Sequence, residues 1–559
     1  MIAGSQLAFK LSGWPILLLA DPSSQFLEFS DFHLNRDCPA VRITSSTTHL
    51  MSIYNPDSPT SWHKVNMSQE TETDNVLEKG YWQSVQAESK VPLHTRVLHK
   101  LMDFARPMIL TKAPANKKPL SRTGYLDGLR GFAAFLVYWQ HHNSWVRETS
   151  GDDEIFENAF GYTGKHYLAT FPFLRVFWTG GHFAVPVFFV ISGYVLSAKP
   201  LSLIQSGEGA KFLDNLSSAL FRRWMRLWLP VAATTYIYMT MAHYPGFYTD
   251  DYFHKATYRE EIWEWYSNIK NFSFIFDTSG NPFFPYNGHI WTIPQEFKGS
   301  IAVYIALVSF CRFPRNSRLF AELVLMWYFI WVTDGCFFAM FIAGMFLCDL
   351  DLLAINNDLP RFLKRLEPYK AIIFYHLLII GLYLSGVPAR NMDMNNVWKA
   401  RGWYYLAYLK PQATFDYKWF YLFWAATFTT ASIPRIGWLR RFFEGRFCQY
   451  LGKVSFGLYL VHGPVIFILA DRLYSAVGFV RIRHLKNMPQ WPNAFPLSMA
   501  GPLGLEFAFL APHIILLPVT FWLAEIVTRF IDDPSVKFAQ NLYRRLAKGP
   551  AAPGPTLKM

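Results

Sequence analysis

Long apolar stretches alternate with shorter polar segments from residue 121 to about residue 535. Each stretch is about 17–25 residues long, which is the length that an α-helix needs to cross the hydrocarbon core of a bilayer. We expect such helices near residues 126–146, 182–198, 224–243, 296–311, 317–333, 333–350, 370–387, 417–434, 450–471 and 504–531. The pattern therefore predicts an all-α fold, a polytopic membrane helix bundle of about ten transmembrane helices.

The two ends of the chain have a different pattern. Residues 1–120 are rich in Ser, Thr, Asp and Glu, and we expect a polar, disordered cytosolic extension there. An apolar run at 7–20 is interrupted by Lys10 and is too short to span. Because it ends in small residues, a signal peptide is an open alternative. Residues 121–535 form the predicted transmembrane domain, and residues 536–559 a disordered cytosolic tail.

Composition supports the membrane class. Hydrophobic residues make up 52% of the chain and charged residues only 17%, whereas soluble proteins have about 25% charged residues. The net charge of +13 lies mostly in short loops between apolar stretches, which is typical of a cytosolic membrane face. We therefore expect contact with membrane lipids and no nucleic-acid partner.

Sequence motifs for several other chemistries are missing. The chain has no GxSxG elbow, Walker loop, HExxH motif or Rossmann glycine pattern. Its five cysteines have no CxxC or Cys/His spacing. We therefore expect neither a metal site nor a disulfide framework, and no tightly bound cofactor.

The distribution of Lys and Arg predicts the orientation. With the N-terminus in the cytosol, the inner loops are much richer in basic residues than the outer loops 147–181, 244–290, 388–416 and 472–503. Both termini are then cytosolic, and the sequon at Asn271 lies on the outer side, where it can be glycosylated.

The first apolar stretch carries ionisable groups that need a chemical reason. Arg130 and His141 are eleven residues apart, so both project from one helix face, with His141 about 16 Å deeper. Asp127 lies on roughly the same face, whereas His142 lies about 120° around the helix from Arg130. Because charged groups are costly in a bilayer and usually mark a site, this stripe is a candidate functional face.

Two further stretches are ambiguous. Ser192 and the glycine after it permit close helix packing, and we favour that interpretation for them. Arg222, Arg223 and Arg226 begin the third stretch at the cytosolic interface. They either anchor the helix in the membrane or clamp the phosphates of a cytosolic donor.

Two polar groups interrupt later stretches. Glu296 is placed at the outer entrance of the fourth predicted helix, where it either faces water or orients a substrate hydroxyl or a histidine. His462 lies in the middle of the ninth, two residues before Pro464, and a buried structural histidine is an equal alternative to a site role.

Taken together, these stretches resemble the acyltransferase 3 family of multipass membrane O-acyltransferases, and the polar N-terminal extension resembles its fungal branch. Five motifs occur in the family's order: LDGLRGFAAFLVYWQH, VFFVISGYVLS, FRRWMRLWLP, IWTIPQE and SFGLYLVHGP. The resemblance implies that Arg130 and His141 correspond to the family's arginine–histidine motif. It also implies that Trp291 and Glu296 correspond to the family's Trp-Thr-x-x-x-Glu motif. Its arginine pair corresponds to Arg226 with either Arg222 or Arg223.

The resemblance implies ten core helices, an acyl-CoA co-substrate, with acetyl-CoA favoured, and transfer to a hydroxyl of a small molecule. The arginine cluster would bind the phosphates of CoA, and His141 would take the proton of the hydroxyl. Arg130 or a serine would stabilise the oxyanion. An acyl-histidine intermediate is the alternative route.

Other functions stay open at this stage. A transporter also has buried charges, and a degenerate family member could act as a scaffold. The acceptor could be a fungal secondary metabolite, a polysaccharide or a lipid, and we expect an endomembrane such as the endoplasmic reticulum as the location.

Overall fold

The structure is a computed structural model that divides into two units, Met1–Lys90 and Val91–Met559. It describes residue 106 and residues 120–547, except 149, 245–246, 248–253, 277–282 and 391. Everything reported below belongs to the second unit. The predictions for residues 1–119 and 548–559 lie outside the described residues, apart from residue 106.

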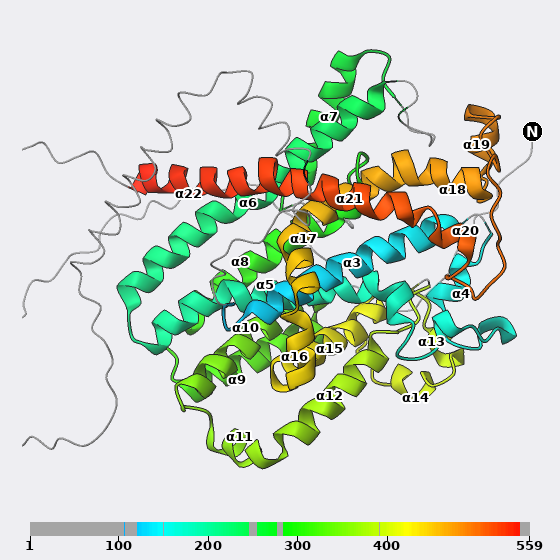
Figure 1. The fold of residues 1–559 in the computed structure, drawn as a ribbon. Coiled ribbons are helices and arrows are strands. Elements are labelled where there is room, and N and C mark those ends of the chain that lie inside the picture. Colours follow the sequence, from blue (N-terminus) through cyan, green and yellow to red (C-terminus); the bar gives the residue numbers. More distant parts are fainter. Residues whose placement is uncertain are drawn as a thin grey trace, which may run out of the picture. The chain divides into compact units, whose positions relative to one another are not determined.

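The described residues are helical and contain no strand. The main helices are α3 (Gly124–Arg147), α5 (Val176–Gln205), α6 (Gly209–His243), α8 (Thr292–Phe310), α9 (Arg315–Trp327), α10 (Cys336–Ile355), α12 (Lys370–Leu384), α15 (Tyr417–Ser432), α17 (Arg446–Val465) and α21 (His513–Val527). Each of the ten predicted ranges falls on one of them (Figure 1).

Four helical segments are long and apolar enough to cross a membrane. They are Val176–Gln205, Cys336–Ile355, Arg446–Val477 and Phe507–Ala547. The helical class is therefore confirmed, and these four segments are candidate membrane spans, whereas ten crossings stay a prediction. The remaining helices are shorter, less apolar or more highly charged.

Close backbone packing holds the centre of the bundle together. In α5, a Cβ on Gly193 would lie 1.9 Å from the carbonyl oxygen of Phe341 in α10, and one on Gly344 would lie 2.0 Å from that of Val190. Small residues allow such approach in membranes, where apolar surface alone does not drive helices together. The packing role predicted for the Ser192-Gly193 step thus belongs to Gly193.

The loops predicted on the outer side meet one another. They carry short helices, α4 (Asp153–Glu157), α13 (Met394–Lys399), α14 (Tyr404–Ala407) and α19 (Ile482–Asn487), at one end of the bundle (Figure 1). Arg390 pairs with Asp153 at 2.6 Å and with Glu154 at 2.9 Å. The indole of Trp178 donates to the carbonyl of Gly504 at 3.2 Å.

A second set of contacts joins loops predicted on the inner side. The buried pair of Arg318 and Asp349 is bidentate, at 2.7 and 2.9 Å, and Gln205 donates to the same carboxylate at 2.8 Å. Arg435 pairs with Asp351. Each of these contacts joins segments that the charge pattern predicts on the same side of the membrane, and the topology itself stays a prediction.

The C-terminal region differs from its predicted disorder. The helix of α21 continues through η9 (Thr528–Asp532) into α22 (Asp533–Ala547), which covers much of the range 536–559. Ala539 is buried, and the ring of Tyr543 one turn later lies 5.5 Å from that of Phe221 in α6. This helical spacing was hidden by the Pro- and Gly-rich composition of the last residues.

The large loop at 244–290 contains a helix, α7 (Tyr258–Phe272), with a capping box formed by Thr257 and Glu260. Its Trp265 donates to Thr235 of α6 at 3.1 Å, which holds the two helices together. Asn271 lies in the last turn of α7 and is exposed.

Candidate active site

A cavity of about 190 Å³ lies between α3, α5, α6, α8 and α17. Its charged lining consists of Arg130, Arg223, Arg226, Lys453, Glu296 and Asp532. Four basic groups against two acidic ones leave the cavity positive, which suits an anionic ligand. We call it the arginine pocket.

Arg130 is fixed in the pocket by α17. Its Nε donates to the hydroxyl of Ser455 at 3.1 Å, and a terminal nitrogen donates to the carbonyl of Gly452 at 3.0 Å. The same nitrogen pairs with Asp127 at 3.0 Å. Asp127 itself is half exposed, so it holds Arg130 from the rim of the pocket.

Glu296 lies inside the arginine pocket rather than at the outer entrance predicted for it. Its carboxylate pairs with Arg223 and accepts a hydrogen bond from Ser192. Arg223 also donates to Ser300 at 2.9 Å. Glu296 is in the second turn of α8, which begins at Thr292, and its largely buried side chain points towards Arg223 of α6. Ser192 is therefore a pocket residue as well as a neighbour of the packing glycine.

The structure distinguishes between the two possible arginine pairs on α6. Arg223 and Arg226 both line the pocket. Arg222 instead donates to the carbonyl of Ser218, one turn earlier in its own helix, at 3.0 Å. The pair predicted from the family motif is thus Arg223 with Arg226, and Arg222 lies outside the pocket.

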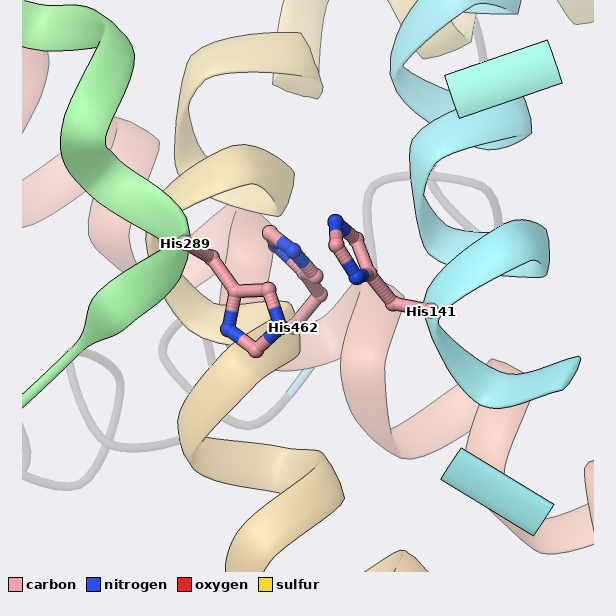
Figure 2. Close-up of side chains that lie close together, drawn as sticks. All are labelled: His141, His289 and His462. Carbon is pink, nitrogen blue, oxygen red and sulfur yellow. The ribbon is translucent and has the colours of Figure 1, made fainter. Parts of the chain in front are cut away.

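Three histidines converge from three different elements. His141 comes from α3, His289 from η4 (Gly288–Trp291) and His462 from α17, and Figure 2 shows their rings pointing towards one another. The ring centroids are 4.1 Å apart for His141 and His289, 5.3 Å for His141 and His462, and 5.0 Å for His289 and His462. We call them the histidine cluster.

Tyr459 lies between the arginine pocket and the histidine cluster. It lines the pocket, and its ring is 5.9 Å from that of His462. Its hydroxyl donates to the carbonyl of His289 at 2.6 Å and lies 2.6 Å from the hydroxyl of Thr292. The pocket and the cluster are therefore neighbouring parts of one polar region along α3 and α17.

The polar region continues beyond His141 towards the outer loops. The side-chain oxygen of Gln140 accepts from the backbone N–H of His182 at 3.1 Å. The ring of His182 lies 3.0 Å from the carboxylate of Glu157. Burial alone would raise the pKa of Glu157, but the neighbouring His182 and Arg175 hold that pKa below its usual value.

Two other candidates lie elsewhere. His142 is fully buried, and its Nδ1 is 2.9 Å from the hydroxyl of Tyr474, with the ring of His513 at 5.1 Å. Trp291 packs in an aromatic group with Phe337 and Trp419, at 6.0 and 5.9 Å. Neither lines the arginine pocket or belongs to the histidine cluster.

The sequence interpretation missed several residues of the site. His289 stands only two positions before Trp291, but nothing in its spacing connects it with the other histidines. Ser455 and Tyr459 could have been found, because they precede His462 by seven and three residues and so share its helix face.

These features describe a helical membrane protein with a buried, positively charged cavity next to a group of histidines. The profile of the acyltransferase 3 family, described as an acyltransferase domain, matches residues 123–507, and the chain belongs to this family. The resemblance inferred from the five motifs is confirmed, and the protein is an acyltransferase.

Curated fungal relatives agree with this assignment. O-acetyltransferase PaAT-1 of Phomopsis amygdali is 26% identical over 78% of this chain and 88% of its own length. Acyltransferase clz18 of Cochliobolus lunatus is 23% identical over 78% and 98%, and acyltransferase R4 of a Phoma species is 23% identical over 76% and 97%. No solved structure matches the chain.

Proposed function

We propose that the protein is a multipass membrane O-acyltransferase that moves an acyl group, acetyl by preference, from acyl-CoA to a hydroxyl of a small molecule. The observation that carries the proposal is the convergence of Arg130, Arg223 and Arg226 in one cavity beside the histidine cluster. The name of one relative, an O-acetyltransferase, supports both the acetyl group and the oxygen acceptor.

The arginine pocket suits the phosphates of the donor. A guanidinium presents a planar set of N–H donors that matches phosphate oxygens, and such charge-assisted bonds are stronger than neutral ones. The cavity of about 190 Å³ holds only part of an acyl-CoA molecule. The nucleotide end would remain on the cytosolic side, and the pantetheine arm would extend past Tyr459 towards His141.

The chemistry takes place at the histidine cluster. The acceptor oxygen attacks the thioester carbonyl, the C–S bond breaks, and the hydroxyl proton passes by way of His141 to the sulfur of the leaving CoA. Arg130 lies about 16 Å along α3 from His141, so its position supports donor binding rather than oxyanion stabilisation. An acyl-histidine intermediate gives the same products.

We propose ten crossings with both termini in the cytosol of an endomembrane such as the endoplasmic reticulum, and a glycan at Asn271. The outer polar groups around His182 and Glu157 then form the acceptor's side of the site. The acceptor is a hydroxylated small molecule, with a fungal secondary metabolite favoured because the curated relatives are fungal. A polysaccharide or lipid hydroxyl is the alternative acceptor.

Incubation of the purified full chain with radiolabelled acetyl-CoA and a panel of hydroxylated fungal metabolites tests this proposal. We expect a labelled ester that forms with wild-type protein and not with His141→Ala. Release of free CoA without any ester, or acceptor uptake into vesicles without chemical change, would refute it.

A further inference from the structure

The histidine cluster leaves buried ring nitrogens without a hydrogen bond. Within residues 120–547, apart from the omitted positions, Nε2 of His462 and Nδ1 of His289 have no hydrogen-bond partner. His462 is 1% exposed. Burying a polar group without a partner costs free energy, so such groups usually have a ligand.

The protonation of His462 is fixed by its own helix. Its Nδ1 lies 3.2 Å from the carbonyl oxygen of Leu458. A carbonyl only accepts, so Nδ1 carries the proton and Nε2 keeps its lone pair. This arrangement, with one ring nitrogen bound to a carbonyl and the other free, is typical of a histidine that binds a metal ion.

The geometry of the three rings allows one ion to be shared. One nitrogen from each of His141, His289 and His462 lies within 4.8 Å of the other two. A tetrahedral zinc ion with Zn–N bonds of about 2.0–2.1 Å places its ligand nitrogens about 3.3 Å apart. Binding would require the three side chains to rotate towards the ion.

We propose that His141, His289 and His462 bind one divalent transition-metal ion, with zinc as the best match. Three imidazoles with an open fourth position form a ligand set found in catalytic zinc sites. Three imidazoles with no carboxylate among them favour zinc over the harder ions magnesium and calcium, which prefer oxygen ligands. No spacing in the sequence indicates this site, because the three ligands lie on three separate elements.

The surrounding contacts hold two of the ligands in place. The side chain of Asn287 donates to the carbonyl of Leu460 at 3.2 Å and accepts from the backbone of His289 at 3.3 Å. With Tyr459 bound to the carbonyl of His289, these bonds fix η4 against α17. Bonds of this kind hold the backbone that carries His289 and His462 in place.

This inference rests on the proposed function and changes how the hydroxyl is activated. A bound ion would act as a Lewis acid at its open position, where it lowers the pKa of an acceptor hydroxyl. His141 would then be a ligand, and the hydroxyl proton would still end on the sulfur of CoA. The overall reaction is unchanged.

Metal analysis of the purified full chain tests the site. The protein carries a tag without histidine, and its metal content is measured by mass spectrometry after exhaustive dialysis. We expect about one zinc ion per chain in the wild type and background amounts in His289→Ala and His462→Ala. The matched control is His513→Ala, because His513 makes the same bond to a carbonyl one turn earlier, at 3.0 Å, but lies outside the cluster.

A chelator separates this inference from the proposed function without any variant. We expect 1,10-phenanthroline to abolish ester formation and zinc to restore it, whereas the non-chelating 1,7 isomer has no effect. Full activity in a metal-free preparation would overturn the metal site and leave the acyltransferase proposal standing. Stoichiometric zinc in the wild type, lost in both cluster variants, supports the site even if no ester forms with any acceptor.

Discussion

The adjacent residues His141 and His142 have different surroundings. His141 belongs to the histidine cluster, whereas His142 packs against Tyr474 and His513, so substitutions at the two positions should affect catalysis and folding separately. His141→Ala should lower the turnover number by about 10²–10⁴, the range for loss of a general base. If His141 binds a metal ion, loss of this ligand would also lower the turnover number. His142→Ala should lower the amount of folded protein, because it removes a fully buried ring bound to Tyr474. Its turnover per folded molecule should stay close to wild type. Reaction rates measured at matched amounts of monodisperse protein distinguish the two effects. A His142→Ala variant that is folded but inactive would show that His142, and not His141, lies on the catalytic face of α3.

The arginines of α6 offer a matched comparison for donor binding. Arg226→Gln removes a cation from the pocket, and a charge-assisted hydrogen bond is worth about 1.5–3 kcal/mol, so KM for acyl-CoA should rise by roughly 10- to 100-fold. Arg222→Gln is the control, because this side chain bonds to its own helix outside the pocket. Initial rates against acyl-CoA concentration measure both. Equal effects of the two substitutions would show that these arginines only anchor the helix.

How far the site could be predicted depended on whether its residues share an element. Arg130 and His141 lie on one helix, so a spacing of eleven residues was enough to align them. The pairing of Glu296 with Arg223, and the approach of His289 to His141, depend on how α8 and η4 pack, which no local pattern contains. Trp291 shows the converse, since it belongs to a recognisable motif but packs away from the pocket.

Between elements, the contact of α5 with α10 should be sensitive to a single methyl group. Gly193→Ala forces a Cβ to within 1.9 Å of the carbonyl oxygen of Phe341, so the helices must separate. Overpacking of this kind costs about 1–3 kcal/mol or more. The control Gly209→Ala adds its methyl group to open space at the start of α6. Thermal unfolding in detergent should show a lower melting temperature for the first variant alone, and an unchanged value for both would contradict the packing.

The apolar periodicity predicted the helices well because lipid leaves a spanning segment few alternatives to a helix. The same periodicity predicted the structure less well in the tail and the loops, where water can satisfy the backbone hydrogen bonds of an irregular chain. The tail from 536 was expected to be disordered, yet Ala539 and Tyr543 recur at helical spacing, and α22 packs on α6. The loop at 244–290 likewise contains α7, whose capping box at Thr257 and Glu260 is visible in the sequence.

For the whole molecule, the loop contacts and the charge distribution predict one topology. Arg390 is bound to Asp153 and Glu154, so the loops 147–181 and 388–416 must lie on the same side of the membrane. The excess of Lys and Arg in the inner loops predicts that this side faces the lumen. The same pattern predicts that the exposed Lys211, in the first turn of α6, faces the cytosol.

Cysteine labelling of sealed microsomes tests this arrangement, in a background with Cys38 and Cys311 replaced by Ser. Lys211→Cys should react with a membrane-impermeant maleimide in intact vesicles. Arg401→Cys, which is also exposed, should react only after detergent permeabilisation, because the bilayer keeps the reagent out of the lumen. Both positions are exposed, and they are predicted to lie on opposite sides of the membrane. After permeabilisation the two variants should therefore be labelled to the same extent. Labelling of Arg401→Cys in intact vesicles would show that the bundle has the opposite orientation. The arginine pocket would then lie on the side of the membrane opposite to cytosolic acyl-CoA.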